Sequence, residues 1–401
     1  MSDLSLAAFE SIIGSENVVG AADPPILIPS NENHLSEIIR KAGSDGVKVI
    51  VEGRGTFPAP EPPGKSVVVS TTSLSSVKEI NSGDFIIITQ TGAVVDDVVR
   101  EAERKGFLVP LDITSGDVAT VGGAFMTGAF GLSAVGYGAF RESVIGVRCV
   151  SPNGDILTGG GRTAKNVTGY DITRFLAGTM GLFAIAFELT IKVQPVPESR
   201  VIVTARFPAG MKSVNAVKKL AAGMKNMTMF EVVAPEGLGG IVTAAVGIEG
   251  MEKIVRRSAD IARDRLGEAG ADEIHDEKRE TFMIKRRDAV KNMVGKDFLT
   301  ISVPPSSSAV LMEKMHACSE TMPVIVHPAI GRFHCVCKDD KVIRALRETS
   351  LSVGGKHPVL WDTIMQEGIS GLFTGAELEI ALSLKRELDP QNILNPHLLK
   401  I

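Results

Sequence analysis

A glycine turn that leads directly into a long apolar strand is the feature that most constrains this chain. The turn is Gly178-Thr179-Met180-Gly181, and the apolar run 183–193 follows it. Glycine has no Cβ, so backbone N–H groups at such a turn can closely approach a flat or anionic ligand. The polar run 165–171 precedes the turn and predicts a loop, with a helix starting at Asp171. We therefore expect a ligand-binding turn beside a buried strand.

Two further glycine-rich segments come earlier, and each admits a structural and a functional interpretation. Gly53-Arg54-Gly55-Thr56 follows a predicted strand. Its N–H groups and guanidinium suit a pyrophosphate, although an ordinary glycine turn would show the same pattern. Prolines at positions 58, 60, 62 and 63 exclude a following helix, so this is not the dinucleotide-fold fingerprint. The segment 116–138 is too dense in glycine for simple packing, which favours contact with a large planar ligand.

Length, charge and cysteine content limit the class of protein. A chain of 401 residues with 44% hydrophobic residues can form about two or three domains with sizeable cores. A net charge of −4 gives no electrostatic footprint for nucleic acid. We expect no signal peptide and no membrane-spanning segment, because no apolar run approaches roughly 18 residues. Four scattered cysteines form no disulfide framework, which favours a reducing, cytoplasmic compartment.

The hydrophobic pattern changes character halfway along the chain, after a linker at 194–197. In the second half, strands alternate with long amphipathic helices, which predicts an antiparallel sheet with helices on one face. The first-half strands are predicted at 26–29, 47–51, 67–70, 85–89, 107–110, 144–151, 155–158 and 183–193, with helices at 31–42 and 94–105. The second-half strands are predicted at 201–207, 229–234, 240–247, 298–303, 323–328 and 333–337, with helices at 211–224, 249–269, 307–322, 338–351 and 376–387.

Three histidines of the second half could carry chemistry. His327 and His334 lie around a turn and could be metal ligands, although histidines in such positions are also common structural residues. His357 lies in a glycine turn, where it could be a general base facing a cofactor or a solvated loop residue. Cys335 and Cys337 alternate along a strand, but without a second cysteine pair they are weak evidence for a metal.

Taken in order, these segments resemble the flavin-binding oxidases of the vanillyl-alcohol oxidase type, which have the PCMH fold. The matching stretches are Gly53-Arg54-Gly55-Thr56, Thr120-Val121-Gly122-Gly123-Ala124, Gly178-Thr179-Met180-Gly181 and the tail, from Leu384-Lys385 through Leu388-Asp389-Pro390 to Ile393-Leu394-Asn395-Pro396. The run Lys165-Asn166-Val167-Thr168-Gly169-Tyr170-Asp171 is most similar to the glycolate oxidase and D-lactate dehydrogenase branch. That run and the tail argue against membership of the enolpyruvyl reductases or the molybdenum hydroxylase subunits, which share the cofactor-binding site of this fold.

The resemblance implies an α+β fold with a particular division of the chain. Residues 20–197 would form a PCMH-type FAD-binding domain of two subdomains. Residues 198–375 would form a cap or substrate domain, an antiparallel sheet with helices on one face. Residues 376–401 would form a C-terminal segment that packs back on the FAD domain.

The resemblance also implies FAD as the cofactor. We expect it to be held without a covalent bond, because the first loop has no His or Cys and Cys149 lies in a predicted strand. The loop 53–56 would hold the pyrophosphate, and 116–123 and 178–181 would line the rest. The implied cofactor-binding residues are Gly53, Arg54, Gly55, Thr56, Gly116, Asp117, Thr120, Val121, Gly122, Gly123, Thr127, Gly128, Gly178, Thr179, Gly181 and Asn395.

Catalytic members of the branch bind a divalent metal through two histidines seven residues apart and a glutamate that precedes another histidine. Here His327 and His334 keep the spacing. Ala329, Ile330 and Arg332 replace the acid and its neighbours of the first motif. Lys356 stands where the glutamate would, and an ammonium group cannot ligate a metal. The resemblance therefore implies His327 and His334 as metal ligands with the third ligand missing.

Two functions are compatible with these residues. In the first, the flavin accepts a hydride from a small 2-hydroxy acid of the glycolate or D-lactate type and a partner takes the electrons. His357 would then be the base and Arg332 the clamp for the substrate carboxylate. In the second, the chain is a non-catalytic FAD-binding module for electron relay or assembly. Residues 354–361 resemble the smaller FAD-binding subunit of glycolate oxidase, which implies a sister flavoprotein subunit and an iron–sulfur protein as partners.

Overall fold

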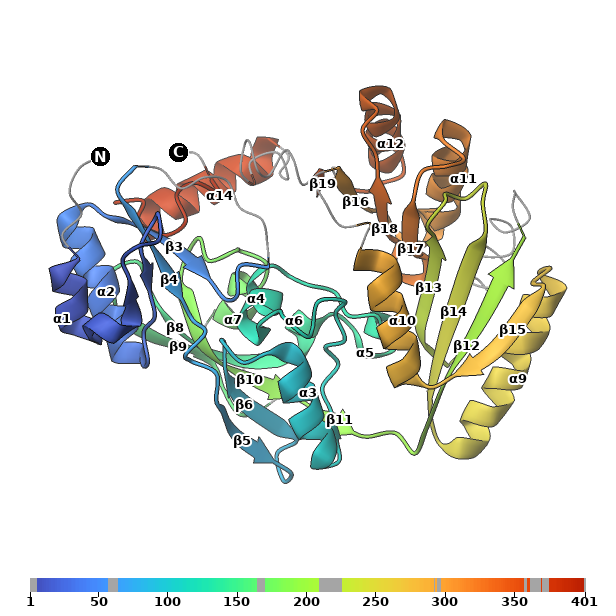
Figure 1. The fold of residues 1–401 in the computed structure, drawn as a ribbon, viewed down its shortest axis with the longest axis horizontal. Coiled ribbons are helices and arrows are strands. Elements are labelled where there is room, and N and C mark those ends of the chain that lie inside the picture. Colours follow the sequence, from blue (N-terminus) through green and yellow to red (C-terminus); the bar gives the residue numbers. More distant parts are fainter. Residues whose placement is uncertain are drawn as a thin grey trace. The chain divides into compact units, whose positions relative to one another are not determined.

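The computed structural model divides the chain into two compact units (Figure 1). It describes residues 6–56, 64–163, 170–208, 226–291, 293, 297–356, 359–360, 369 and 375–399. Unit 1 comprises Met1–Gly131, Ala139–Val196 and Met365–Ile401, and unit 2 comprises Leu132–Gly138 and Pro197–Ile364.

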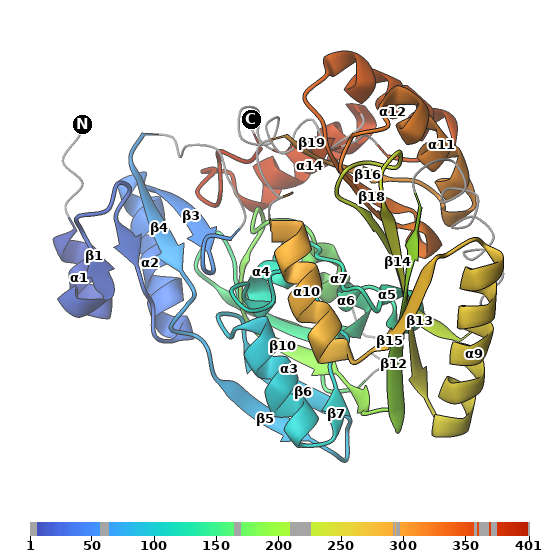
Figure 2. The ribbon, with the colours of Figure 1, turned by 45° about the vertical axis from the view of Figure 1, so that its right-hand side comes forward.

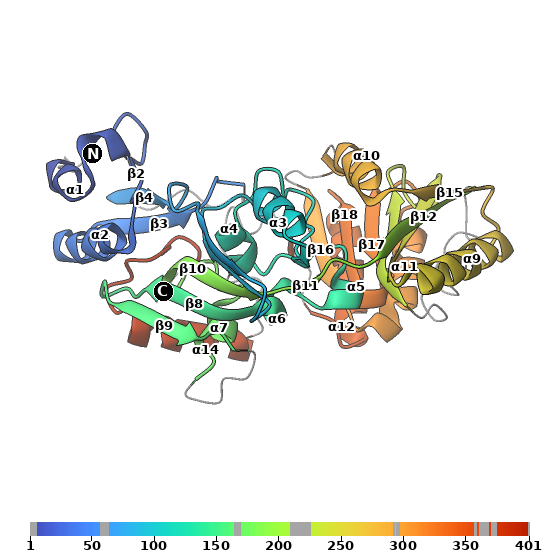
Figure 3. The same ribbon diagram turned by 90° about the horizontal axis from the view of Figure 1, so that it is seen from below.

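Unit 1 contains two larger sheets that form separate layers (Figure 3), and a small antiparallel pair of β7 and β11. The first sheet has the strand order β1-β2-β4-β3, in which β2 and β3 both run parallel to β4. The second has the order β5-β6-β10-β8-β9, and all its pairs are antiparallel. The strands of unit 1 are β1 (Val18–Val19), β2 (Ile26–Leu27), β3 (Lys48–Glu52), β4 (Ser66–Ser70), β5 (Val77–Asn81), β6 (Ile86–Gln90), β7 (Phe107–Leu108), β8 (Val144–Val150), β9 (Ile156–Gly160), β10 (Ile185–Lys192) and β11 (Gln194–Pro195).

Helix α2 (Glu32–Asp45) joins the two layers. It begins where the sequence predicts, because the Asn31 side chain accepts hydrogen bonds from the N–H groups of Asn33 and His34. Its apolar face, including Leu35, packs in one core with strands of both sheets. The other helices of unit 1 are α1 (Ala7–Ile13), the 3₁₀ turn η1 (Ser15–Asn17), α3 (Val95–Arg104), α4 (Val121–Met126), α6 (Phe140–Ser143), α7 (Ile172–Leu176) and α14 (Gly375–Leu388).

The chain returns to unit 1 at its C-terminal end. After α14, Leu394 forms a parallel β-bridge with Val49 of β3, at the free edge of the first sheet. Ile393 and Leu394 are buried in the core of that sheet. The tail therefore extends the sheet from which the 53–56 loop leaves.

Burial of His397 in this tail predicts a loss of stability in mild acid. Burial lowers the pKa of His397 to about 4, so the unfolded chain binds more protons than the folded chain between pH 6.5 and 4. Above about pH 6.5, His397 therefore does not reduce the free energy of unfolding. Below that pH the free energy of unfolding falls by up to about 1.4 kcal/mol per pH unit. We expect His397→Gln to lose less stability between pH 7.5 and 5.5 than the unaltered protein, in urea unfolding at both pH values. The same substitution at exposed His275 is the control, and equal pH dependence in all three proteins would refute the assignment.

Unit 2 is built on one eight-stranded sheet with the order β15-β12-β14-β13-β17-β18-β16-β19, antiparallel throughout. Its strands are β12 (Ser199–Phe207), β13 (Met227–Ala234), β14 (Val242–Gly250), β15 (Glu273–Glu277), β16 (Phe298–Ser302), β17 (Val324–His327), β18 (Arg332–Val336) and β19 (Val359–Leu360). Its helices are α5 (Ala134–Tyr137), α9 (Glu252–Glu268), α10 (Arg279–Lys291), α11 (Ser308–Cys318) and α12 (Asp340–Ser352), with 3₁₀ turns η2 (Pro305–Ser307) and η3 (Pro328–Ile330).

The two faces of this sheet are covered differently. Helices α9, α11 and α12 cover one face and supply core residues such as Leu266, Met315 and Leu346. Helix α10 covers the opposite face (Figure 2). There Phe282 packs with Ile202 and Met229. The sequence pattern predicts the first layer of helices. It does not predict α10, because that helix is highly charged and carries few apolar residues.

Some predicted elements cannot be compared with the structure. The predicted helix 211–224 and most of the loop 165–171 lie outside the described residues. Strand β15 is present although its polar sequence gave no strand signal, because it pairs along β12. In the described part of the chain, no helix is long and apolar enough to span a bilayer.

Candidate functional site

The three glycine-rich segments of unit 1 come together in space. We call them the β3 loop (residues 53–56), the α4 segment (120–128) and the β10 turn (178–181). A Cβ on Gly53 would lie 2.3 Å from Thr120 Oγ1, so the first two segments touch at the glycine. The N–H of Gly178 donates to the carbonyl of Phe125 at 3.1 Å, which joins the second and third. The predicted ligand-binding loops therefore form one surface.

Glycine is required where these segments meet the rest of unit 1. A Cβ on Gly122 would lie 2.5 Å from the Thr91 Cβ, and the Gly122 N–H donates to the Thr91 carbonyl at 2.7 Å. Thr120 caps α4 by accepting a hydrogen bond from the Gly123 N–H at 3.0 Å. The backbone of α4 is thus pressed against the strand behind it, which a side chain at position 122 would prevent.

The β3 loop presents backbone donors that no acceptor in the described part of the chain uses. Gly55 has a left-handed φ of 63°, and the Gly53 carbonyl is fixed by the Ser70 hydroxyl at 3.1 Å. Within the described residues, the N–H groups of Arg54, Gly55 and Thr56 donate to no protein acceptor. Successive free N–H groups beside a guanidinium form an anion-binding concavity. The loop therefore fits a phosphate or diphosphate group.

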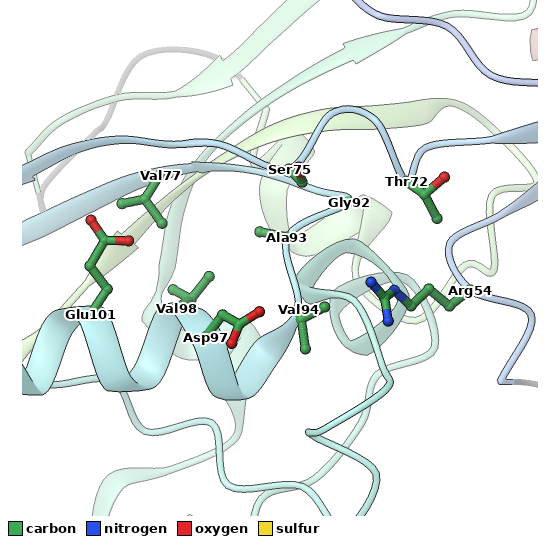
Figure 4. Close-up of a pocket in the computed structure, with 10 residues that line it drawn as sticks. All are labelled: Arg54, Thr72, Ser75, Val77, Gly92, Ala93, Val94, Asp97, Val98 and Glu101. Carbon is green, nitrogen blue, oxygen red and sulfur yellow. The ribbon is translucent and has the colours of Figure 1, made fainter. Parts of the chain in front are cut away.

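A polar cavity of about 220 Å³ adjoins the β3 loop (Figure 4). Arg54 extends from the loop toward the start of α3 (Figure 4). Asp97 lies in the first turn of this helix and Glu101 one turn further on. Gly92 lines the cavity, and a Cβ there would lie 1.9 Å from the Thr71 carbonyl oxygen. The sequence indicates only Arg54 of this set, because the others come from segments without a glycine motif.

The remaining predicted cofactor residues contribute to the protein's own framework. Gly116 packs on the start of α3, because its carbonyl accepts the Asp96 N–H at 3.0 Å, whereas Asp117 is exposed. The hydroxyl of Thr127 donates to the Gly123 carbonyl at 2.7 Å. The hydroxyl of Thr179 donates to the Leu176 carbonyl at 2.8 Å. These residues shape the surface formed by the loops.

Unit 2 carries a second cluster of polar residues on the face of its sheet that α10 covers. Alternation along the strands places apolar residues such as Phe230 and Phe333 on the opposite face. It therefore places Glu231, His327 and His334 on the α10 face. Register brings them close, because His327 pairs with Arg332 and Val232 with Val326. This cluster also includes Arg332 and Thr300 from the neighbouring strands.

Glu231 and Arg286 form a buried ion pair at the centre of this cluster. Glu231 is 0% exposed and Arg286 on α10 is 6% exposed. Arg286 Nε lies 2.8 Å and 2.7 Å from the two carboxylate oxygens, and Nη2 lies 2.5 Å from Oε1. His327 Nε2 lies 3.6 Å from Glu231 Oε1. Both oxygens of Glu231 are thus held by a cation of the protein.

The two predicted histidines meet beside this pair. The ring centroids of His327 and His334 are 5.9 Å apart, and the His334 ring stacks on Phe298 at 5.3 Å. His334 Nδ1 shares a hydrogen bond of 2.9 Å with the Thr300 hydroxyl. Burial, and after it the neighbouring His327, Arg332 and Arg286, hold the pKa of His334 well below its ordinary value. The His334 imidazole is therefore neutral at physiological pH.

Arg332 supplies a positive charge to the same cluster. Burial lowers the pKa of its guanidinium to about 10, so Arg332 remains charged at neutral pH. A partly buried guanidinium is suited to binding a carboxylate through two parallel hydrogen bonds.

The cluster does not fit a divalent metal ion. Over the described ranges, no group of three or more His, Cys, Asp and Glu side chains could hold one. The predicted ligands His327 and His334 are brought together, but the carboxylate beside them is bound by Arg286. Two guanidinium groups in the cluster would also repel a metal cation.

The predicted base His357 lies outside the described residues. The residue before it is fixed to the sheet, because the Lys356 N–H donates to the Ser302 carbonyl at 2.9 Å. Its carbonyl accepts from the Ser350 hydroxyl at 2.8 Å.

Comparison with known proteins identifies the kind of domain that the first part of the chain forms. Residues 24–160 match the family described as "FAD binding domain". This part of the chain is an FAD-binding domain. The whole chain has the fold of p-cresol methylhydroxylase, with a TM-score of 0.77 and 13% identity over 99% of this chain and 96% of that one. The predicted PCMH-type α+β fold and the predicted FAD cofactor are thereby confirmed.

Two curated relatives cover nearly the whole chain. Glycolate oxidase subunit GlcD of Bacillus subtilis is 26% identical over 92% of this chain and 87% of that protein. Mitochondrial D-lactate dehydrogenase [cytochrome] of Arabidopsis thaliana is 25% identical over 92% of this chain and 72% of that protein. The predicted similarity to the glycolate oxidase and D-lactate dehydrogenase branch is confirmed.

The FAD-binding domain fits its cofactor at the β3 loop. Unused N–H groups at 54–56 and the Arg54 guanidinium suit the pyrophosphate. When bound, FAD would serve as a two-electron acceptor. Sequence reasoning missed Glu231, Arg286 and Thr300 of the second cluster. A charged residue at the centre of an otherwise apolar strand, as at position 231, was the available signal.

Proposed function

We propose that this protein oxidises a small 2-hydroxy acid to the corresponding 2-oxo acid, with FAD as the electron acceptor. The observation that carries the proposal is the cluster of partly buried Arg332 and His334 with buried His327, in a chain whose other unit binds FAD. The relatives are named for glycolate and D-lactate, whose shared chemistry is a carboxylate beside a hydroxyl.

The charge of each residue would determine its role in binding the substrate. Arg332 would bind the carboxylate through paired hydrogen bonds. Neutral His334, oriented by Thr300, would contact the substrate hydroxyl. In the reaction the α-carbon loses a hydride and the hydroxyl loses a proton, and His357 is the proposed acceptor of the proton.

We propose the corresponding division of the chain. Residues 20–197 bind FAD, residues 198–375 bind the substrate, and residues 376–401 complete the FAD domain. The FAD is held without a covalent bond, and the cytoplasm is the proposed compartment. A sister flavoprotein subunit and an iron–sulfur protein would take the electrons, in keeping with the relative named as a glycolate oxidase subunit.

A second candidate, a non-catalytic relay or assembly subunit, is favoured by one observation. The only carboxylate of the described cluster, Glu231, is neutralised by Arg286. A cluster whose charges are already paired within the protein in this way would bind substrate poorly. In that case FAD would only pass electrons between partner subunits or stabilise their assembly.

Anaerobic titration of the FAD-loaded chain separates the two functions. Glycolate, both lactate enantiomers and D-2-hydroxyglutarate are added singly, and the absorbance of the oxidised flavin is followed. Bleaching by one acid supports the oxidoreductase and identifies its substrate. No bleaching by any acid, with a flavin that dithionite still reduces, refutes it and favours the relay.

Metal removal gives an independent prediction. Because Arg286 binds Glu231 and no third ligand is available in the described cluster, we expect no resident divalent metal. Protein equilibrated with Zn²⁺ or Mn²⁺ and then desalted should hold well under one ion per chain by elemental analysis. Chelator treatment should leave flavin reduction unchanged. One tightly held ion per chain, or activity that requires added metal, would contradict this account.

A further inference from the structure

A single side chain of the C-terminal tail connects two of the three cofactor segments. Asn395 is 2% exposed. Its Oδ1 accepts the Val51 N–H at 2.8 Å, two residues before the β3 loop. Its Nδ2 donates to the carbonyl of Met180 in the β10 turn at 2.7 Å. The Asn395 amide therefore bridges the end of strand β3, from which the β3 loop leaves, and the β10 turn.

The β10 turn needs this support because its backbone is unusual. Met180 has a left-handed φ of 53°, a conformation that a residue with a side chain keeps only where its surroundings determine it. Its N–H donates to the Met126 carbonyl at 2.7 Å, and its carbonyl accepts from Asn395. Gly181 has a φ of 73°, and a Cβ there would lie 2.7 Å from Asn395 Nδ2. The α4 segment and the tail thus hold the turn from two sides.

A buried lysine fixes the tail in the position that this bridge requires. Lys385 is 0% exposed, and its ammonium group donates to the Leu182 carbonyl at 2.7 Å and the Leu394 carbonyl at 2.6 Å. It also binds Asp389 Oδ2 at 2.7 Å. Asp389 in turn accepts the N–H groups of Ile393 and Leu394, each at 2.9 Å. All three donors of the ammonium are used, which couples the end of the β10 turn to the segment that carries Asn395.

We propose that Asn395 is a positioning residue for FAD, and that docking of the C-terminal tail is energetically coupled to cofactor binding. Both polar atoms of its amide are used by the protein, so it acts through the β3 loop and the β10 turn. A docked tail sets the two segments in the geometry that receives FAD. By linkage, bound FAD stabilises the docked tail to the same extent.

The first test measures FAD affinity of the apoprotein by quenching of flavin fluorescence. Asn395→Asp keeps the shape and the acceptor for Val51 but loses the donor to Met180, and Asn395→Ala loses both. We expect the dissociation constant to rise about tenfold for the aspartate and further for the alanine. Gln391→Ala, at an exposed position of the same tail, should leave the dissociation constant of FAD unchanged. Affinities equal to that of the unaltered protein in both Asn395 variants would overturn the proposal.

Hydrogen exchange on the unaltered full chain gives a second test that needs no variant to fold. FAD should slow exchange at the N–H groups of Val51 and Leu394, which are the amides bound by Asn395 and Asp389. An amide of unit 2 such as Val246 is the reference. Unchanged exchange in the tail on FAD binding would overturn the coupling, and a purely structural role of Asn395 predicts that result.

Discussion

Replacing Arg286 with methionine should lower the free energy of unfolding by about 3–5 kcal/mol. The substitution keeps an unbranched apolar stem but removes the guanidinium that binds both oxygens of Glu231. Glu231 is 0% exposed, so its carboxylate would remain buried with no cation to compensate its lost hydration. Urea unfolding of the apoprotein at pH 7.5 measures the change.

Two further variants separate this mechanism from a general loss of packing. The double variant Arg286→Met with Glu231→Leu removes both charges and should recover most of the loss. Arg256→Met removes a guanidinium from an exposed pair with Glu252 on α9 and should change stability far less. A double variant no more stable than the Arg286→Met protein would contradict the assignment of the loss to an unpaired buried charge.

Replacing Arg332 with methionine should lower the second-order rate constant of flavin reduction by a 2-hydroxy acid about 100- to 1000-fold. The expectation follows from the loss of a paired charge interaction in a partly buried site, about 3–4 kcal/mol at 1.4 kcal/mol per factor of ten. Anaerobic stopped-flow absorbance of the FAD-loaded protein measures it. The effect should appear mainly as weaker substrate binding, because the guanidinium contacts the carboxylate.

A conservative variant and a surface variant test the role of Arg332. Arg332→Lys keeps the charge but not the paired donors, so it should recover only part of the rate. Arg206→Met, on strand β12 of the same sheet and 43% exposed at its side chain, should react like the unaltered protein. An Arg332→Met protein with an unchanged rate constant would remove Arg332 from the substrate site.

The cofactor segments were predictable because glycine leaves a local signal. At 53, 122 and 181, glycine is required by a close approach or a left-handed φ, and each position lies next to a strand or helix that the pattern also predicts. The strands around them were largely predictable because their hydrophobic pattern is likewise a local signal. Their order in two separate sheets was not, since pairing depends on contacts between distant segments.

The second cluster was only half predictable. His327 and His334 share a short stretch of sequence, so their proximity could be inferred. The pairing of Glu231 with Arg286 depends on a helix that crosses the sheet 55 residues further along the chain. Helix α10 has no apolar stripe to reveal it, because several of its residues are charged.

The role of Lys385 could not be inferred from local pattern at all. A lysine near the end of an amphipathic helix is expected to be exposed. Here it is buried, because Asp389 one turn later and two carbonyl groups satisfy its donors. The sequence predicts Asn395 as a cofactor-binding residue, and in the structure both polar atoms of its amide bind backbone groups, at Val51 and Met180.

Product formation by the isolated chain tests the proposed oxidation of a 2-hydroxy acid most directly. The FAD-loaded protein is mixed without oxygen with an excess of each candidate 2-hydroxy acid, and the 2-oxo acid is measured alongside the loss of oxidised flavin. We expect one molecule of 2-oxo acid for each flavin reduced, with one of the acids. An oxidised flavin and no 2-oxo acid with every candidate would contradict it.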